Sequence, residues 1–132
     1  MKYQELIDMT IVDSADAIQK KAISPVELVE AELERIQNID KKLNSFINLF
    51  ADGAIMEAKN AEKKILAGEY LGVLHGIPIG LKDLYYTKNL PTTAGSKVIK
   101  DFIPIEDATV VTKLKSAGAI ILGKLNMDEF AR

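Results

Sequence analysis

Cysteine is absent from this 132-residue sequence, which excludes a disulfide, a thiolate metal site and a cysteine nucleophile. Histidine occurs once, as His75, so the chain cannot supply a multi-histidine zinc site, and we expect no metal. A Ser-His-Asp triad could form only around His75. That residue precedes Gly76 in a predicted loop, where we expect a structural or solvent-exposed role. These absences exclude several classes of hydrolase before any motif is considered.

Long hydrophobic runs and an excess of one charge are also lacking. The longest strongly apolar run, residues 119–122, is far too short to span a bilayer, and the first residues contain no apolar signal core. The net charge is -2 with lysines and acids intermixed, so nothing favours direct nucleic-acid binding. Neither a Walker sequence nor G-x-G-x-x-G is present, so no nucleotide cofactor is expected. We predict a cytoplasmic globular protein without membrane contact or cofactor.

A capping signal marks the clearest helix. Ser24 suits an N-cap, Pro25 suits the first helical position, and Glu27 completes a capping box. Ile23 and Leu28 occupy the two positions of a hydrophobic staple. Helical spacing then predicts a helix to about residue 38, with one inward face formed by Val26, Val29, Leu33 and Ile36.

Short apolar strands alternate with the other predicted helices. One helix begins near Asp13 and buries Ala17 and Ile18. Strands are predicted over residues 46–50, 77–82 and 119–122, the last closed by Gly123. A helix between the first two strands has an inward face of Ala54, Ala58, Ala61 and Ile65 and ends before Gly68. This alternation indicates an α/β fold with helices covering a sheet.

The later helices depend on weaker signals. Asp107 can cap a helix that ends at Gly118 and turns four residues inward: Val110, Val111, Leu114 and Ala117. Asn126, with Glu129 three residues later, predicts a last helix, which stops after two turns at Arg132. We interpret that short helix as a sign that the domain is truncated. The turn-rich residues 92–96 are expected to form a polar loop.

Lys82 is the one candidate catalytic residue. In a strand over residues 77–82, Lys82 shares a face with Pro78 and Gly80, so nothing bulky crowds its stem. A lysine that loses hydration at the end of an apolar strand can serve as a general base. Periodicity alone favours an ordinary surface lysine, for which the adjacent Asp83 is the candidate partner.

Several motifs together resemble one family. Residues 74–83 (LHGIPIGLKD) are similar to the lysine-bearing strand of amidase-signature enzymes. Other matching pieces occur in the right order along nearly the whole chain: residues 23–28 (ISPVEL), 43–47 (LNSFI), 90–96 (LPTTAGS), 107–111 (DATVV), 118–124 (GAIILGK) and 126–131 (NMDEFA). The resemblance implies that residues 1–132 are the N-terminal portion of a single amidase-signature domain, an α/β/α sandwich around a mixed sheet.

The resemblance also assigns a role to Lys82. In this family the equivalent lysine belongs to a Ser–cis-Ser–Lys triad that hydrolyses carboxamide C–N bonds. The Gly- and Ser-rich segment that supplies the bridging serine is absent here. None of the chain's serines lies in such a segment: Ser14, Ser24, Ser45, Ser96 and Ser116. We therefore predict that this polypeptide alone is inactive.

Three functional hypotheses remain open. The first is a general amidase with a small-molecule amide substrate. Leu125 and the sequence Leu84-Tyr85-Tyr86 slightly favour this hypothesis. The second is the glutaminase of a tRNA-dependent amidotransferase, its A subunit, which would work with partner subunits. The third is a non-catalytic scaffold or binding module. Because an incomplete sheet would expose apolar surface and a strand edge, self-association is also expected.

Overall fold

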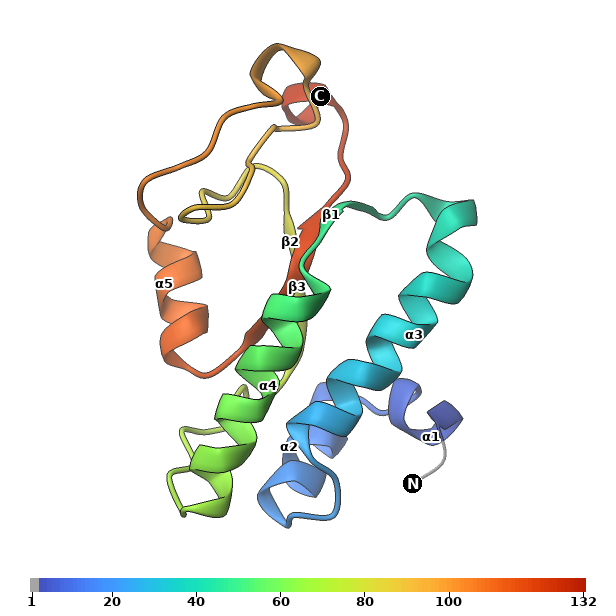
Figure 1. Cartoon of the computed structure of the whole chain (residues 1–132), viewed down its shortest axis with the longest axis vertical. Helices are drawn as coiled ribbons and strands as arrows, with labels where there is room; N and C mark the ends of the chain where they lie inside the picture. The colour runs from blue at the N-terminus through green and yellow to red at the C-terminus, as the bar shows by residue number, and fades with distance from the viewer. Residues whose placement is uncertain (1–2) are drawn as a thin grey trace.

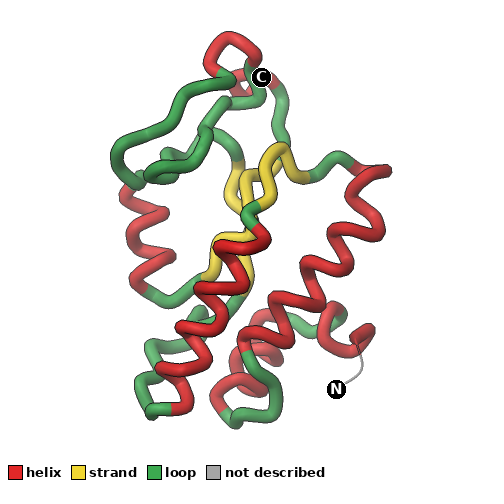
Figure 2. The backbone as a smooth tube through the Cα atoms, in the orientation of Figure 1, coloured by secondary structure: helices red, strands yellow, loops and turns green. Residues whose placement is uncertain are grey.

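The computed structural model describes residues 3–132, and its strands meet in the middle of the molecule (Figures 1 and 2). The elements in chain order are α1 (Tyr3–Ile7), α2 (Ile11–Gln19), α3 (Pro25–Leu43), β1 (Phe46–Leu49), α4 (Ala51–Leu66), β2 (Pro78–Lys82), the 3-10 turn η1 (Lys97–Ile99), α5 (Thr109–Ser116), β3 (Ile120–Leu125) and the 3-10 turn η2 (Glu129–Ala131). Loops predominate at the end of the sheet where β2 stops, as Figure 2 shows.

The capping box of α3 is confirmed. The Ser24 hydroxyl accepts from the Glu27 amide at 3.1 Å, and the Glu27 carboxylate accepts from the Ser24 amide at 2.8 Å. The staple residues Ile23 and Leu28 are buried in the same cluster. The helix continues to Leu43, beyond the predicted end, because Asn44 adopts the left-handed conformation that terminates it.

The helix before α3 begins earlier than predicted. Thr10, and not Asp13, is its N-cap: the Thr10 hydroxyl accepts from the Asp13 amide at 3.2 Å. Ala17 and Ile18 are buried, as expected. The inward face of α4 is also confirmed, since Ala54, Ala58, Ala61 and Ile65 are all buried. Small residues on this face let α4 approach the sheet closely.

The sheet described for residues 3–132 has the order β1-β3-β2. β3 is central, antiparallel to β1 and parallel to β2, so the sheet is mixed as expected. β3 extends through Gly123, which was predicted to close it. A Cβ on Gly123 would collide with the Asn48 carbonyl of β1, so glycine here permits close pairing inside the strand.

Helices cover both faces of the sheet. Ile120 and Leu122 of β3 pack against α3 and α4, whereas Ile121 faces the opposite side and packs with Val111 of α5 and Leu81 of β2. Figure 1 shows α5 on one side of the sheet and the α3–α4 pair on the other. The strand alternation of β3 therefore builds an α/β/α arrangement, which confirms the predicted fold class.

Three predictions near the C-terminus are wrong. Asp107 does not cap α5; its carboxylate accepts from the Lys88 amide at 2.7 Å and from Lys115 Nζ at 2.8 Å. Val110 is 42% exposed, so only part of the predicted face is buried. Asn126 does not begin a helix, since only the short 3-10 turn η2 follows it. The Glu129 carboxylate, expected in the first turn of that helix, instead accepts from the Ser96 hydroxyl at 2.7 Å.

Candidate functional site

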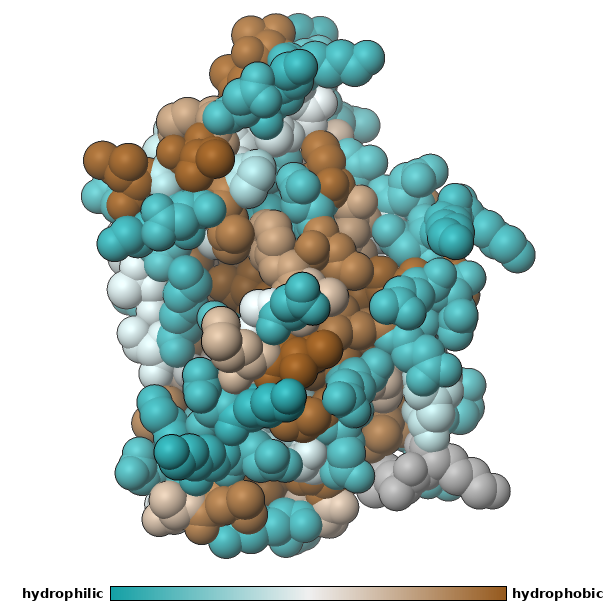
Figure 3. Space-filling model, in the orientation of Figure 1, coloured by the Kyte–Doolittle hydropathy of each residue, from teal (hydrophilic) through white to brown (hydrophobic). Residues whose placement is uncertain are grey.

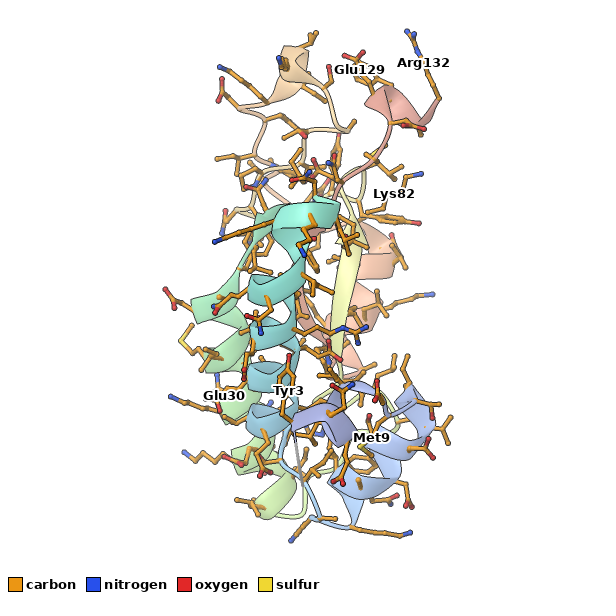
Figure 4. All side chains as sticks on the ribbon, turned by 90° about the vertical axis from the view of Figure 1, so that its right-hand side faces the viewer. Tyr3, Met9, Glu30, Lys82, Glu129 and Arg132 are labelled. Carbon is orange, nitrogen blue, oxygen red and sulfur yellow. The ribbon has the colours of Figure 1, made fainter. Side chains whose placement is uncertain are left out.

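Lys82 is the last residue of β2, at the edge of the sheet among the described strands. As predicted, Leu81 is buried while Gly80 and Lys82 are exposed. Within residues 3–132 no hydrogen bond or ion pair holds the Lys82 ammonium. Figure 4 shows Lys82 toward the same end of the molecule as Glu129 and Arg132, and far from Tyr3 and Met9. The expected loss of hydration is therefore not realised in this chain.

A shallow open hollow of about 350 Å³ surrounds Lys82. It is lined by Lys82, Leu125, Asn126, Met127, Asp128, Ala131 and Arg132. Leu125 packs closely against Gly80 of β2, since a Cβ there would stand 2.9 Å from Leu125 Cδ2. Glycine at this position thus permits the close approach of the Leu125 side chain. The Lys82 ammonium therefore stays open to groups that enter the hollow.

A second lysine near this strand end has the opposite surroundings. Lys124 of β3 is 0% exposed, and its ammonium donates to the Tyr85 carbonyl at 2.8 Å and to the Thr92 hydroxyl at 2.9 Å. Lys124 Nζ also lies 3.5 Å from Asp83 Oδ1. Asp83 is 0% exposed as well, so both charges of this pair are fully buried. Asp83 pairs with Lys124 and not with its neighbour Lys82, the partner that periodicity suggested.

The Asp83 carboxylate also organises the loop opposite. Its Oδ2 accepts hydrogen bonds from the Thr93 amide at 3.1 Å and from the Thr93 hydroxyl. Its Oδ1 has no hydrogen-bond donor among the described residues and faces only the Lys124 charge. Thr92, Thr93 and Ser96 are buried. The predicted polar loop at residues 92–96 is confirmed as a loop, and its buried side chains make it part of a buried polar cluster.

Burial has a direct electrostatic consequence for Lys124. Loss of hydration lowers the pKa of the Lys124 ammonium, while the Asp83 carboxylate opposes that shift. Removing either charge alone would leave the other without compensation in the interior. Sequence reasoning missed this pair. The available signal was a lysine two residues after the apolar run 119–122, within the same strand.

His75 has a structural role. It is 2% exposed, and its Nδ1 accepts from the Leu71 amide at 3.1 Å. Burial, and then the nearby positive charge of Lys64, lower the pKa of His75. A ring nitrogen that accepts a backbone amide cannot also donate to a carboxylate, as a triad histidine must. The structural expectation for His75 is confirmed, and this residue is not solvent-exposed.

Two of the serines serve local structure. Ser24 caps α3, and the Ser96 hydroxyl accepts from the Val98 amide at 3.2 Å while donating to Glu129. Within residues 3–132 no three His, Asp or Glu side chains converge as a metal site. No helix in that range is long and apolar enough to cross a membrane. Lys82 is thus the one predicted site residue that the described chain presents to an open hollow.

Comparison with known proteins identifies the family. Residues 27–132 match the amidase family. The chain is 48% identical over 97% of its length to the A subunit of the glutamyl-tRNA(Gln) amidotransferase of Anaeromyxobacter dehalogenans, of which it covers 26%. The chain therefore spans about a quarter of the length of this curated relative.

Solved structures agree in fold. An amidase family protein from Bacillus anthracis superposes with a TM-score of 0.88 at 36% identity, over 97% of this chain and 26% of that one. The native peptide amidase from Stenotrophomonas maltophilia gives a TM-score of 0.87 at 33% identity, over 93% of this chain and 26% of that one. Since both the sequence match and the fold match cover most of its residues, the chain belongs to the amidase family.

Proposed function

We propose that the protein containing this chain hydrolyses carboxamide C–N bonds, with Lys82 as the proton-accepting member of a Ser–cis-Ser–Lys triad. Residues 1–132 would form the N-terminal portion of a single amidase-signature domain and would be inactive alone. One observation carries the proposal: in a chain of the amidase family, Lys82 ends a strand with an unpaired ammonium, among the described residues, in an open hollow. An unpaired lysine at a strand end is free to meet a substrate or a serine.

The exposure of Lys82 defines what the rest of the protein must provide. A lysine acts as a base only when it is neutral, and hydration favours its charged form. We infer that a segment outside residues 1–132 covers the hollow, removes water from Lys82 and brings the two serines to it. Neutral Lys82 would then accept a proton, through the bridging serine, from the serine that attacks the amide carbonyl. The C–N bond would then break, the amine would leave with that proton, and water or another amine would accept the acyl group from the acyl-enzyme.

A second candidate function is supported by the curated relative. That relative is named as the A subunit of a glutamyl-tRNA(Gln) amidotransferase, and the 48% identity to it favours glutamine as the amide and a complex as the working form. Identity to a named amidotransferase component outweighs the slight tilt toward a general amidase that Leu125 and residues 84–86 suggested. In this version the protein would release ammonia from glutamine and would require partner subunits. A cytoplasmic location accords with either function and remains a prediction.

The test is the Lys82→Ala variant of the full-length protein. Ammonia release from glutamine and from benzamide should fall by a factor on the order of 10³ or more, since a general base contributes roughly 10²–10⁴. Folding should be retained, because the Lys82 side chain makes no polar contact with the rest of the described chain. Lys113→Ala, at another exposed lysine, is the matched control.

Three outcomes separate the hypotheses. Hydrolysis of benzamide without partners favours a general amidase, whereas glutamine hydrolysis that depends on co-purifying subunits favours the amidotransferase. Near-normal activity of Lys82→Ala would remove Lys82 from the mechanism. A full-length wild-type protein without any amidase activity, alone or with partners, would leave the scaffold hypothesis standing.

Self-association of the isolated chain is a separate proposal. β2 is an edge strand among the described residues, and large apolar side chains are exposed, including Val12, Val98 and Ile105. Figure 3 shows apolar residues gathered near the middle of one face, surrounded by hydrophilic ones. Such surfaces favour pairing between copies. Light scattering that finds only monomers at high concentration would contradict it.

A further inference from the structure

Lys124 is bound by groups that all belong to the segment directly after Lys82. Its ammonium donates to the Tyr85 carbonyl and the Thr92 hydroxyl, and it faces the Asp83 carboxylate. These partners lie within residues 83–93, which leave β2 at Lys82. The buried Lys124 ammonium on β3 therefore fixes the course of residues 83–93, which directly follow the candidate catalytic residue Lys82 in the chain.

We propose that Lys124 is a positioning residue for Lys82: its buried ammonium fixes residues 83–93 on β3 and thereby sets the direction of the Lys82 side chain. This inference rests on the proposed function, in which Lys82 accepts a proton. Lys124 itself would touch neither substrate nor serine, because it is 0% exposed.

The backbone at Asp83 transmits the constraint. The Asp83 amide donates to the Leu125 carbonyl at 3.1 Å, which continues the β2–β3 pairing one residue beyond Lys82. The Asp83 carbonyl accepts from the Ala94 amide at 2.8 Å, so the loop at residues 92–96 is attached to the same residue. Because alternate residues of a strand face opposite sides, fixing Asp83 on the Lys124 side directs Lys82 toward the hollow.

The contacts of Lys124 exceed what charge compensation needs. An ammonium has three donors, and here two of them bind neutral oxygens, on Tyr85 and Thr92, while the Asp83 oxygen lies farther away. An ion pair alone would require only Asp83. The two neutral contacts hold two separate points of the segment that follows Lys82, and an apolar side chain of similar length could not replace them.

The experiment compares three variants of the full-length protein. Lys124→Met removes the ammonium and leaves Asp83 unpaired. Lys124→Met combined with Asp83→Asn removes both charges, so no buried charge is left uncompensated, and the amide oxygen that Asp83→Asn introduces can still accept from Thr93. Lys115→Met combined with Asp107→Asn removes a partly exposed ion pair of α5 and serves as the control. Kinetics with glutamine or benzamide, and thermal melting, are measured for each.

If Lys124 positions Lys82, kcat should stay low even in the variant whose melting temperature is restored. Both Lys124 variants should lose about a hundredfold in kcat, the typical effect of a small displacement of a catalytic group, with KM changed less than about threefold. The double variant should regain most of the melting temperature lost by the single variant and yet remain slow. Recovery of kcat together with melting temperature would overturn the inference, as would an equal kcat loss in the control.

Hydrogen exchange separates this inference from the proposed function. If Lys82→Ala retains full activity, the proposed function fails, and the kinetic comparison no longer reports on positioning. Hydrogen exchange at the Asp83 and Ala94 amides still reports on positioning. The exchange rates of both amides should be higher in the double variant than in wild type and unchanged in the control. Unchanged protection of these two amides would overturn the role of Lys124 irrespective of the kinetics.

Discussion

Lys82 and Lys124 occupy neighbouring positions across one strand pair but lie in opposite environments. In the parallel pairing of β2 with β3, Lys82 is opposite Leu125 and Lys124 is opposite Leu81. Lys82 faces an open hollow without a polar partner among the described residues, whereas the Lys124 ammonium has two hydrogen bonds and a buried carboxylate. The contrast follows from strand alternation, which turns the two side chains to opposite faces of the sheet.

This comparison bears on the proposed role of Lys82. A side chain held by three groups, like Lys124, contributes order but cannot approach a substrate. A side chain without a partner in the described chain, like Lys82, contributes little to the fold and is available for reaction. Perturbed and buried charges often mark functional sites, but they also mark structural networks. Here Lys124, whose pKa is lowered by burial, belongs to a structural network.

The largest effect should come from breaking the buried pair. We expect Lys124→Met to lower the free energy of unfolding by about 3–5 kcal/mol, because it leaves the buried Asp83 carboxylate uncompensated. Lys82→Met should change it by less than about 0.5 kcal/mol, as for other exposed positions. Urea denaturation of both variants measures the difference. Equal destabilisation would show that the environments of the two lysines do not differ as described.

A smaller effect should follow from removing one neutral contact of Lys124. Thr92→Val deletes the hydroxyl that accepts from Lys124 Nζ, and hydrogen bonds to charged groups contribute about 1.5–3 kcal/mol. Urea denaturation should therefore place this variant between wild type and Lys124→Met. The matched control is Thr112→Val on the exposed side of α5, where little change is expected. A neutral result for Thr92→Val would assign the effect to Asp83 and the Tyr85 carbonyl.

The smallest effect concerns alkaline pH. Since burial lowers the pKa of Lys124 in the folded state, the unfolded chain binds more protons between that lowered value and the ordinary 10.5. The Lys124 contribution to stability should accordingly rise with pH through this window. Tyr3 and Tyr70, whose pKa values are raised by burial, act in the opposite sense above pH 10 but are common to all variants.

The measurement is the difference in unfolding free energy between wild type and Lys124→Met at several pH values from about 7 to about 10, below the ordinary lysine pKa. That difference should widen as pH increases. A difference that narrows at high pH would show that the Asp83 carboxylate, and not burial, dominates the titration of Lys124.

Local signals predicted most of the helices and the outline of the fold. The capping box at Ser24 and the alanine face of α4 depend on contacts within a few residues, so sequence spacing was sufficient to find them. The alternation of apolar strands and helices likewise predicted an α/β arrangement with helices covering a sheet. Lys82 was located at a strand end by period-two alternation, and its proposed role came from family resemblance.

Predictions failed where a residue has a distant partner. Asp107 was expected to cap its own helix but binds the Lys88 amide. Asn126, with Glu129 three residues later, was expected to begin a helix, but Glu129 binds Ser96. Gly123 was expected to end its strand, yet it lies inside β3 because the Asn48 carbonyl of β1 approaches it closely. Polar residues accept partners from anywhere in the fold, and a single sequence does not indicate which segment will supply them.

By itself the sequence determined the start of α3, the strand that carries Lys82 and the exposed, uncrowded face on which Lys82 lies, because each depends on the period and chemistry of adjacent residues. Only the tertiary structure decided that Lys124, and not Lys82, is the buried lysine, and that Asp83 is its partner. That assignment requires β2, β3 and residues 83–93 to meet at one end of the sheet. Burial is a property of their packing, since it depends on which segments exclude water from a charge.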